Sequence, residues 1–361
     1  MKVGILTFHR ANNFGAVMQC YALQRYLTLC GHDVNIIDYH CKAVEMQYDI
    51  LNPRVLWSRK NIFASLRVYL DRIRQCQSLR EKGEGFDKFR QKYLRLTEPV
   101  VALNSKMDYD VLITGSDQVW NLHITNGVDR LYFLCGPLPE RIKRVAYAVS
   151  SADKLDMFDN NLSEALCCLN RFDSISVREV SLKDYLTTKL KKTIYSCVDP
   201  CFLIDREEYD KMTIPSNVSK PYILVYQMTY IEAANEAAEK IGRDYGYEVM
   251  YYYGGAAPNR KNSHTIVNPQ DFLGKIAGAS LVLTSSFHGI VFSIIYEKDF
   301  WTFEYSGNGR QLNLLSLLGL RDRMVSSSKQ IVLDKHVDYS TVHKSLADVV
   351  MASKQFLNDA L

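Results

Sequence analysis

Several side chains near the end of the sequence could bind an anion or move a proton. The stretch "TSSFHG", residues 284–289, joins an apolar run to a second apolar run with helical spacing, which predicts His288 at the amino terminus of a helix. A histidine there could act as a general acid or base, and Ser286 and Gly289 could help it hold an anion. The alternative is a histidine with only a structural role.

A second stretch, "DVLITGSDQVWN" at residues 110–121, predicts a buried strand that runs directly into polar residues. The Ser116 hydroxyl and the Asp117 carboxylate would lie at the carboxyl end of that strand, where ligands of parallel α/β sheets bind. Asp117 is therefore a candidate general base. Either residue could instead be the N-cap of the next helix.

A third stretch, "SISVREVS" at residues 174–181, places Arg178 directly after another predicted strand. The arginine fork can grip a carboxylate or a phosphate with two parallel hydrogen bonds. Glu179 beside it supports a second interpretation, in which Arg178 belongs to a structural ion pair.

The opening turn, "TFHRANNFGA", combines polar side chains with a glycine before a predicted helix that begins at about Ala16. Backbone N–H groups at a helix amino terminus attract anions, and Asn12 and Asn13 add side-chain donors. His9 and the backbone freedom of Gly15 complete the candidate binding loop. The alternative is a polar bend without a ligand.

Short apolar strands alternate with amphipathic helices in two successive parts of the chain, and the loops described above connect them. The pattern predicts an α/β protein with two Rossmann-like domains, and the cleft between such domains is the default active site. The predicted domains are residues 1–205, with a helical insertion at about 44–100, and residues 206–340, followed by a C-terminal helix at 341–361.

The composition is that of a globular protein, with 361 residues, of which 47% are hydrophobic and 23% charged. No apolar run approaches the roughly 20 residues of a membrane-spanning helix, so we expect a cytoplasmic protein. The net charge of +4 is too small to indicate nucleic-acid binding. The nine cysteines lie in apolar contexts without paired CxxC blocks, which predicts reduced packing residues and no metal site.

One segment is more basic than the rest of the chain. Residues 54–95 contain twelve lysines or arginines and four acidic residues, and the phrase "NIFASLRVYLDRIRQC" has an amphipathic helical pattern. It could make peripheral contact with the inner face of an anionic membrane or with a lipid-linked glycan. The alternative is a helical hairpin packed on the sheet with a solvated basic face.

In this order, the stretches "TFHRANNFGAVMQCYALQRYL", "ITGSDQVWN", "VAYAVSS", "ISVREVS", "CVDPCFLI" and "TSSFHGIVFSII" resemble the polysaccharide pyruvyl transferase family. The resemblance runs from residue 1 to about Arg323. It implies a GT-B-like fold, with two Rossmann-like domains facing across a cleft. It also implies transfer of pyruvate, as a ketal, from phosphoenolpyruvate to a sugar of a bacterial surface polysaccharide or its lipid-linked precursor, with release of phosphate and no need for a metal or nucleotide cofactor.

The resemblance also implies roles for the candidate residues. His288 would be the catalytic acid or would contact the phosphate, and Asp117 would be the base, although the sequence does not assign acid and base between the two. The donor phosphoenolpyruvate would be held by Arg178, Ser286, Gly289 and Arg310. The acceptor sugar or an anion would be held by His9, Asn12, Asn13, Gly15 and Ser116.

One position departs from the family pattern. Some members carry an arginine two residues before the histidine of the last motif, where this chain has Ser286. Two other functions therefore stay open: a GT-B glycosyltransferase that uses a nucleotide sugar, and a non-catalytic carbohydrate-binding relative. No glycine-rich GxGxxG supports the first of these in the second domain.

Overall fold

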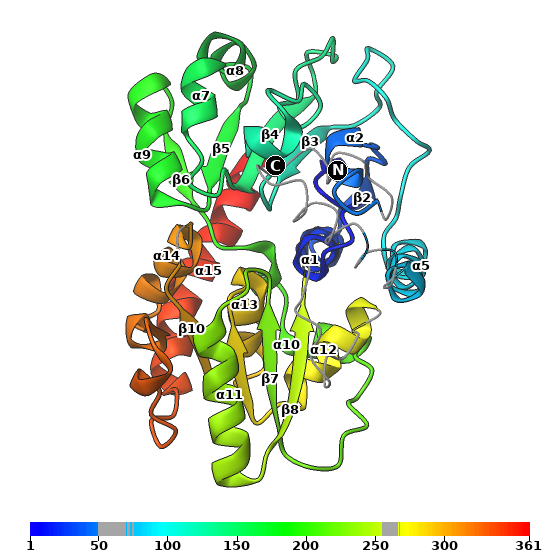
Figure 1. Cartoon of the computed structure of the whole chain (residues 1–361). Helices are drawn as coiled ribbons and strands as arrows, with labels where there is room; N and C mark the ends of the chain where they lie inside the picture. Colours follow the sequence, from blue (N-terminus) through cyan, green and yellow to red (C-terminus); the bar gives the residue numbers. More distant parts are fainter. Residues whose placement is uncertain (50–69, 71–72, 74–75, 255–265, 267, 306) are drawn as a thin grey trace. The chain divides into compact units, whose positions relative to one another are not determined.

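The chain forms two compact units, each built around a parallel sheet. The computed structural model describes residues 1–49, 70, 73, 76–254, 266, 268–305 and 307–361 (Figure 1). The first unit comprises residues 1–47, 89–204 and 344–361, and the second comprises residues 48–88 and 205–343.

The first unit has a six-stranded sheet in the order β2-β1-β3-β4-β5-β6, with every pair parallel. Parallel pairing requires a crossover between successive strands, and the alternation of strands and helices in the sequence supplies it. The strands are β1 (Lys2–Leu6), β2 (Asp33–Ile36), β3 (Val111–Gly115), β4 (Lys143–Val149), β5 (Ser174–Val177) and β6 (Ile194–Ser196).

Both faces of this sheet are covered, which explains why its strands are continuously apolar. Leu112, Ala146 and Ile175 belong to one buried cluster with residues of the helices that follow β4 and β5. On the other face, Tyr147 packs against Phe356, with ring centroids 6.3 Å apart. The helices are α1 (Phe14–Leu29), α2 (Lys42–Glu45), α6 (Leu122–Thr125), α7 (Asp156–Asn160), α8 (Leu162–Leu169), α9 (Val180–Lys189) and the 3-10 helix η1 (Pro200–Phe202).

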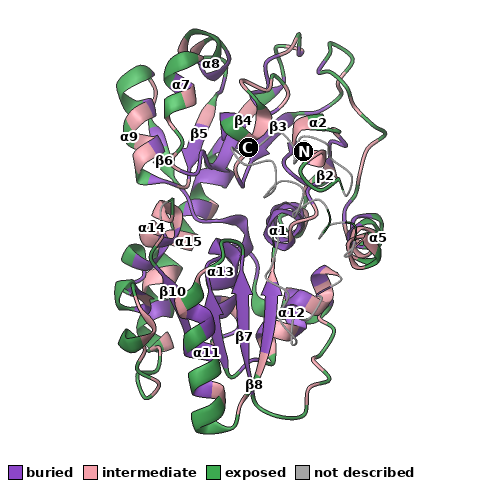
Figure 2. Ribbon diagram, in the orientation of Figure 1, coloured by how far each residue is buried: buried purple, intermediate pink, exposed green. Residues whose placement is uncertain are grey.

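The second unit has a five-stranded sheet in the order β11-β10-β9-β7-β8, again with every pair parallel. Ile223 and Val225 of β7 cluster with the apolar face of α11, whereas Tyr226 contacts Phe272 of α12. Alternate residues of one strand thus face opposite helical layers, and β7 is buried along its whole length (Figure 2).

The bounds of the second unit's elements are as follows. The strands are β7 (Tyr222–Gln227), β8 (Glu248–Tyr253), β9 (Leu281–Thr284), β10 (Phe300–Phe303) and β11 (Met324–Val325). The helices are α10 (Arg206–Asp210), α11 (Glu232–Tyr245), α12 (Pro269–Ala277), α13 (Phe287–Ile295), α14 (Gly309–Leu317) and the 3-10 helices η2 (Arg321–Arg323) and η3 (Ser328–Gln330). Two helices contain residues of both units, α5 (Cys76–Tyr93) and α15 (Tyr339–Ala360).

The predicted fold class is confirmed, because both halves of the chain form parallel α/β sheets of the Rossmann type. The predicted insertion at 44–100 falls partly on residues outside the described ranges, and so does most of the phrase "NIFASLRVYLDRIRQC". The described residues from Tyr48 to Lys88 group with the second unit, although the sequence analysis placed them in the first domain. The described part of the C-terminal segment from residue 344 groups with the first unit.

Two further findings concern membrane-spanning helices and disulfides. No helix among the described residues is both long enough and apolar enough to cross a bilayer. All nine cysteines are free, and six of them are buried.

Candidate functional site

In each unit, the candidate residues follow the carboxyl ends of central strands. Ser116 and Asp117 follow β3, and Arg178 follows β5, in the first unit. The loop from Ser285 to His288 follows β9 in the second unit. This is the edge of a parallel sheet at which α/β proteins bind their ligands.

In the second unit, Ser286 is the N-cap of helix α13. Its backbone is extended and its hydroxyl accepts a hydrogen bond from the Gly289 N–H at 3.3 Å. An N-cap serine satisfies one of the backbone donors that a helix leaves without an intrahelical partner. The position where some family members carry arginine therefore has a structural role in this chain.

Gly289 allows the first turn of α13 to approach the sheet closely. A Cβ atom at this position would lie 2.3 Å from the Thr284 Oγ1 atom and 2.9 Å from a ring carbon of Tyr226. Both distances are shorter than a carbon atom tolerates without displacement of its neighbours. Packing against Thr284 and Tyr226 thus requires a glycine at this position.

Ser285 fixes the loop from the other side. Its hydroxyl accepts from the N–H groups of Met228 and Thr229, each at 3.1 Å, and donates to the Thr229 carbonyl at 2.6 Å. Its carbonyl oxygen accepts from Gln311 at 2.7 Å and from Tyr305 at 3.1 Å. The strand end, the loop after β7 and helix α14 therefore hold this turn in one geometry.

His288 and Arg310 both lie beside Phe287. His288 is buried in the first turn of α13, and its ring meets the Phe287 ring edge-on with centroids 5.2 Å apart. The Arg310 guanidinium, in the first turn of α14, lies 5.6 Å from the centroid of the same ring. The structure thus brings together the four candidate residues of this unit, which are Ser286, His288, Gly289 and Arg310.

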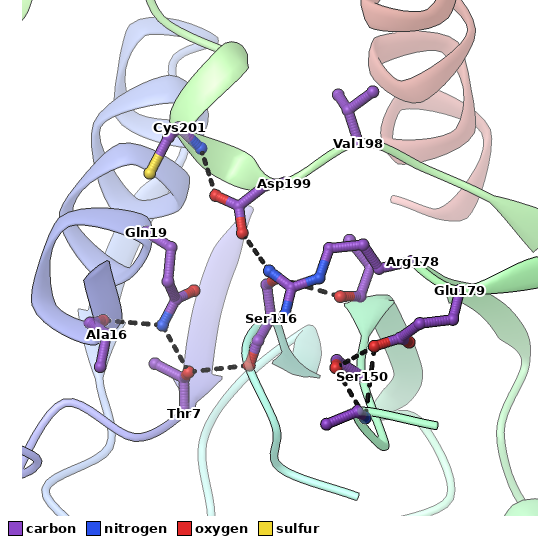
Figure 3. Close-up of polar contacts among 12 residues, drawn as sticks. Thr7, Ala16, Gln19, Ser116, Ser150, Arg178, Glu179, Val198, Asp199 and Cys201 are labelled. Carbon is purple, nitrogen blue, oxygen red and sulfur yellow. Dashed lines mark hydrogen bonds and ion pairs between the residues drawn. The ribbon is translucent and has the colours of Figure 1, made fainter. Parts of the chain in front are cut away.

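In the first unit, Ser116 and Asp117 are buried in a sharply bent loop after β3. The Ser116 hydroxyl donates to the Ala148 carbonyl at 3.0 Å, and the Ser116 carbonyl accepts from Thr7 at 3.2 Å (Figure 3). Asp117 has a φ of +60°, a conformation that few residues other than glycine adopt. Such backbone strain persists where surrounding structure enforces it, often at functional sites. Neither residue caps a following helix, because α6 is capped by Asn121.

Arg178 forms a buried ion pair with Asp199, a residue that the sequence analysis did not select (Figure 3). The Asp199 side chain is fully buried, and it also accepts from the Cys201 N–H at 3.0 Å. Glu179 instead bonds to the Ser150 hydroxyl and to the Ala152 N–H. The structural ion pair considered from the sequence thus exists, and its acid is Asp199.

The surroundings of Arg178 stabilise its charge. Burial acts to lower the pKa of the guanidinium, but the negative charges of Asp199, Glu179 and Asp117 outweigh it and raise that pKa. Arg178 therefore remains cationic. Since one of its donors contacts Asp199, replacing Arg178 would also remove the cation that pairs with this buried carboxylate.

The opening turn is held by hydrogen bonds and ion pairs to other residues of the first unit. His9 is fully buried between the Thr7 carbonyl at 3.0 Å and the Asp38 carboxylate at 2.9 Å, and Arg10 pairs with the same carboxylate. Burial lowers the pKa of His9, although Asp38 and Thr7 oppose the shift. For Asp38, burial acts to raise the pKa, but the bonds from His9 and Arg10 outweigh it and lower it.

The remaining residues of this turn also have local partners. The Asn12 side chain accepts from Arg90 at 3.0 Å, and Asn13 is the N-cap of α1, accepting from the Ala16 N–H at 3.2 Å. Gly15 lies within the first turn of α1, so the expected helix start at about Ala16 is two residues late. The sequence analysis placed Gly15 in the bend before the helix, but Gly15 is part of the helix.

Sequence reasoning missed four polar residues that build these loops: Asp38, Arg90, Asp199 and Gln19. Gln19 is fully buried on α1 and donates to the Thr7 hydroxyl and the Ala16 carbonyl, both at 2.8 Å. A polar residue on an otherwise apolar helix face was the available signal for Gln19. Asp199, in "CVDPCFLI", precedes a proline after a predicted strand, which is a signal for a loop at the sheet edge.

Solved structures share this architecture. A candidate UDP-N-acetylglucosamine 2-epimerase from Listeria monocytogenes aligns over 99% of this chain and 94% of its own, with 10% identity and a TM-score of 0.51. Another UDP-N-acetylglucosamine 2-epimerase aligns over the same shares, with 10% identity and a TM-score of 0.50. The heptosyltransferase WaaC of E. coli with ADP aligns over 100% of both chains, with 11% identity and a TM-score of 0.39. At these identities the likeness to the two epimerases shows the fold alone, which is GT-B-like.

Two comparisons concern the sequence itself. No curated protein matches the chain. The family model described as polysaccharide pyruvyl transferase matches residues 13–307, a span that contains the β3 loop, the β5 loop and the β9 loop described above. The chain therefore belongs to the polysaccharide pyruvyl transferase family.

Proposed function

We propose that this protein transfers pyruvate from phosphoenolpyruvate to two hydroxyl groups of a carbohydrate, forming a ketal and releasing phosphate. The acceptor would be a sugar of a bacterial surface polysaccharide or of its lipid-linked precursor. The observation that carries the proposal is the β9 loop, where buried His288 lies in the first turn of α13 and Arg310 lies against the same phenylalanine ring. Membership of the family supports the reaction type.

The chemistry of the donor suits this loop. Phosphoenolpyruvate carries a carboxylate and a phosphate, and both are favoured by a helix amino terminus and by an arginine fork. We propose that Arg310 supplies the cation on this side, since Ser286 is committed to capping α13. The rigid strand-to-helix turn gives the anion a preorganised site, which lowers the entropic cost of binding.

The reaction requires one proton to enter and two to leave. The donor methylene carbon takes up a proton and becomes a methyl group, while the central carbon gains bonds to two sugar oxygens and loses its bond to the phosphate oxygen. The two hydroxyl protons are balanced by the new methyl hydrogen and by the proton carried by the released phosphate. We propose His288 as the acid and Asp117 as the base.

The direct test incubates the purified protein with phosphoenolpyruvate and a panel of acceptors containing galactose or mannose, both free and lipid-linked. We expect phosphate release together with an acceptor whose mass has increased by one pyruvate ketal. Parallel reactions contain nucleotide sugars in place of phosphoenolpyruvate. Release of a nucleoside diphosphate would indicate a glycosyltransferase, and no product from either donor would indicate a carbohydrate-binding relative.

Variants of the second unit test the donor loop. Arg310→Met is expected to weaken phosphoenolpyruvate binding about 10- to 100-fold by calorimetry, because it removes the cation and keeps an apolar side chain against Phe287. Arg243→Met, at an exposed position on α11, is the matched control and should bind as the wild type does. His288→Gln should lower kcat about 10²- to 10⁴-fold. Wild-type binding by the Arg310 variant would remove Arg310 from the donor site.

A further inference from the structure

The second unit contains a buried arginine beside a cavity that the proposed reaction does not use. Arg323 is the last residue of η2 and only 2% exposed. Its guanidinium lies 4.9 Å from the centroid of the Trp301 ring, which supplies a cation–π contact. The cavity beside it has a volume of about 240 Å³.

The charge of Arg323 is not balanced by a neighbouring acid. Within the described part of the chain, no carboxylate oxygen lies within 4.0 Å of the Arg323 guanidinium, and its buried Nη1 atom has no hydrogen-bond acceptor. A buried charge without a counter-charge costs several kcal/mol, more than a single cation–π contact returns. A fixed cation in this setting indicates that an anion completes the site.

The other charged groups around the cavity already have partners. Lys335 pairs with Asp322 at 2.5 Å, and His336 contacts the Asp299 carboxylate at 2.6 Å. Asp338 accepts hydrogen bonds from Ser340 and Thr341 at the start of α15. Within the described residues, Arg323 is therefore the cation of this lining that has no carboxylate partner.

The cavity lies near the amino ends of the strands of this sheet, whereas the β9 loop lies at their carboxyl ends. Arg323 immediately precedes the amino end of β11, and Asp299 immediately precedes the amino end of β10. The β9 loop follows a carboxyl end, and β9, β10 and β11 are all parallel. A ligand held by Arg323 would thus not occupy the proposed donor loop.

We propose that this cavity binds a small oxyanion, a phosphate or carboxylate group gripped by the Arg323 guanidinium against Trp301. The cavity volume is below the roughly 300–1,000 Å³ of sites for drug-sized ligands, so a compact anion fits better than a nucleotide. Lys335, His336 and Thr341 provide additional polar groups on the wall. The inference concerns a second site and does not depend on the proposed transfer reaction.

Trp301 provides a local probe for the test. The protein is labelled with 5-fluorotryptophan, and the ¹⁹F resonance of Trp301 is assigned with Trp301→Phe among the three tryptophans. Inorganic phosphate and, separately, acetate are titrated at constant ionic strength with chloride as the reference anion. We expect the Trp301 resonance to shift to saturation with one of them, and the effective anion identifies the phosphate or carboxylate class.

Three variants separate this site from the donor loop. Arg323→Met should raise the apparent Kd for the effective anion at least tenfold, whereas Arg321→Met, exposed on the same 3-10 helix, should leave it unchanged. Arg310→Met, in the proposed donor loop, should also leave the Trp301 response unchanged. A Trp301 resonance that stays still in the wild-type protein with both anions would overturn the proposal, as would an equal shift in folded Arg323→Met.

Discussion

At the scale of single residues, the main feature of the first unit is a buried ion pair between Arg178 and Asp199. Arg178 and Asp199 are both buried, so each stabilises the other in a region from which water is largely excluded. The pair also orders the loop, because Asp199 caps the 3-10 helix η1 through the Cys201 N–H. Arg178 therefore has a structural role whatever ligand it binds.

Asp199→Asn is expected to lower the free energy of unfolding by about 3–5 kcal/mol, since it leaves the Arg178 charge buried without its nearest counter-charge. Urea unfolding followed by circular dichroism measures the change. Asp108→Asn is the control, because Asp108 pairs with Lys2 and Arg141 at the exposed surface, where solvent screens the charges, and should change the free energy of unfolding far less. Equal effects of the two variants would contradict the importance of the buried pair.

At the scale of elements, helix α5 is held to strand β8 through a lysine. The Lys82 ammonium donates to the Tyr252 hydroxyl at 2.6 Å and lies 5.3 Å from the centroid of that ring. Burial lowers the pKa of Lys82 to about 8. The charged amine is thus less favoured in the folded state than in water.

The stability of the protein should therefore depend on Lys82 in the alkaline range. Because the folded state prefers the neutral amine, Lys82 lowers the free energy of unfolding when it is charged in both states. This penalty is absent above the unfolded pKa of about 10.4 and is fully present once the pH falls below the folded pKa of about 8. Lys82→Met should raise the free energy of unfolding by about 1–2 kcal/mol at pH 7, with an advantage that shrinks from pH 8 to pH 10.

Thermal melts across this pH range measure the difference between Lys82→Met and the wild type. Lys88→Met, at an exposed position on the same helix, should show no such trend with pH. A constant difference between Lys82→Met and the wild type from pH 7 to pH 10 would show that Lys82 titrates normally.

At the scale of the whole molecule, the fold is stabilised without covalent cross-links. All nine cysteines are free, although the number alone would allow four disulfides. Six are buried, all in the first unit, and act there as small apolar residues. For Cys20, burial raises the thiol pKa, which makes the reactive thiolate rare.

Alkylation with iodoacetamide under native conditions should label Cys30 and Cys167 first, because these two are exposed. Cys76 is intermediate and should react more slowly, and the six buried cysteines should react only after unfolding in guanidinium. Intact-mass spectrometry counts the labels over time. Thermal stability should not change when a reductant is added, and a large decrease would reveal a disulfide.

The sequence by itself determined the class of fold and the positions of the polar loops. Strands β3, β5 and β9 directly precede the three polar stretches, as the sequence predicted, because short apolar runs bounded by polar residues are typical of buried strands. The order of the motifs also indicated the family that the comparison of residues 13–307 confirmed. These features depend on local composition and spacing, which a sequence records directly.

Only the tertiary structure decided which side chains meet. Asp199 pairs with Arg178, which lies 21 residues away in the sequence. Asp38 bonds to His9 over 29 residues, and Arg90 bonds to Asn12 over 78. Each partner is selected by the alignment of parallel strands and by the packing of helices on them, which no local pattern encodes. The same holds for Arg323, whose isolation beside Trp301 follows from the pairing of β10 with β11.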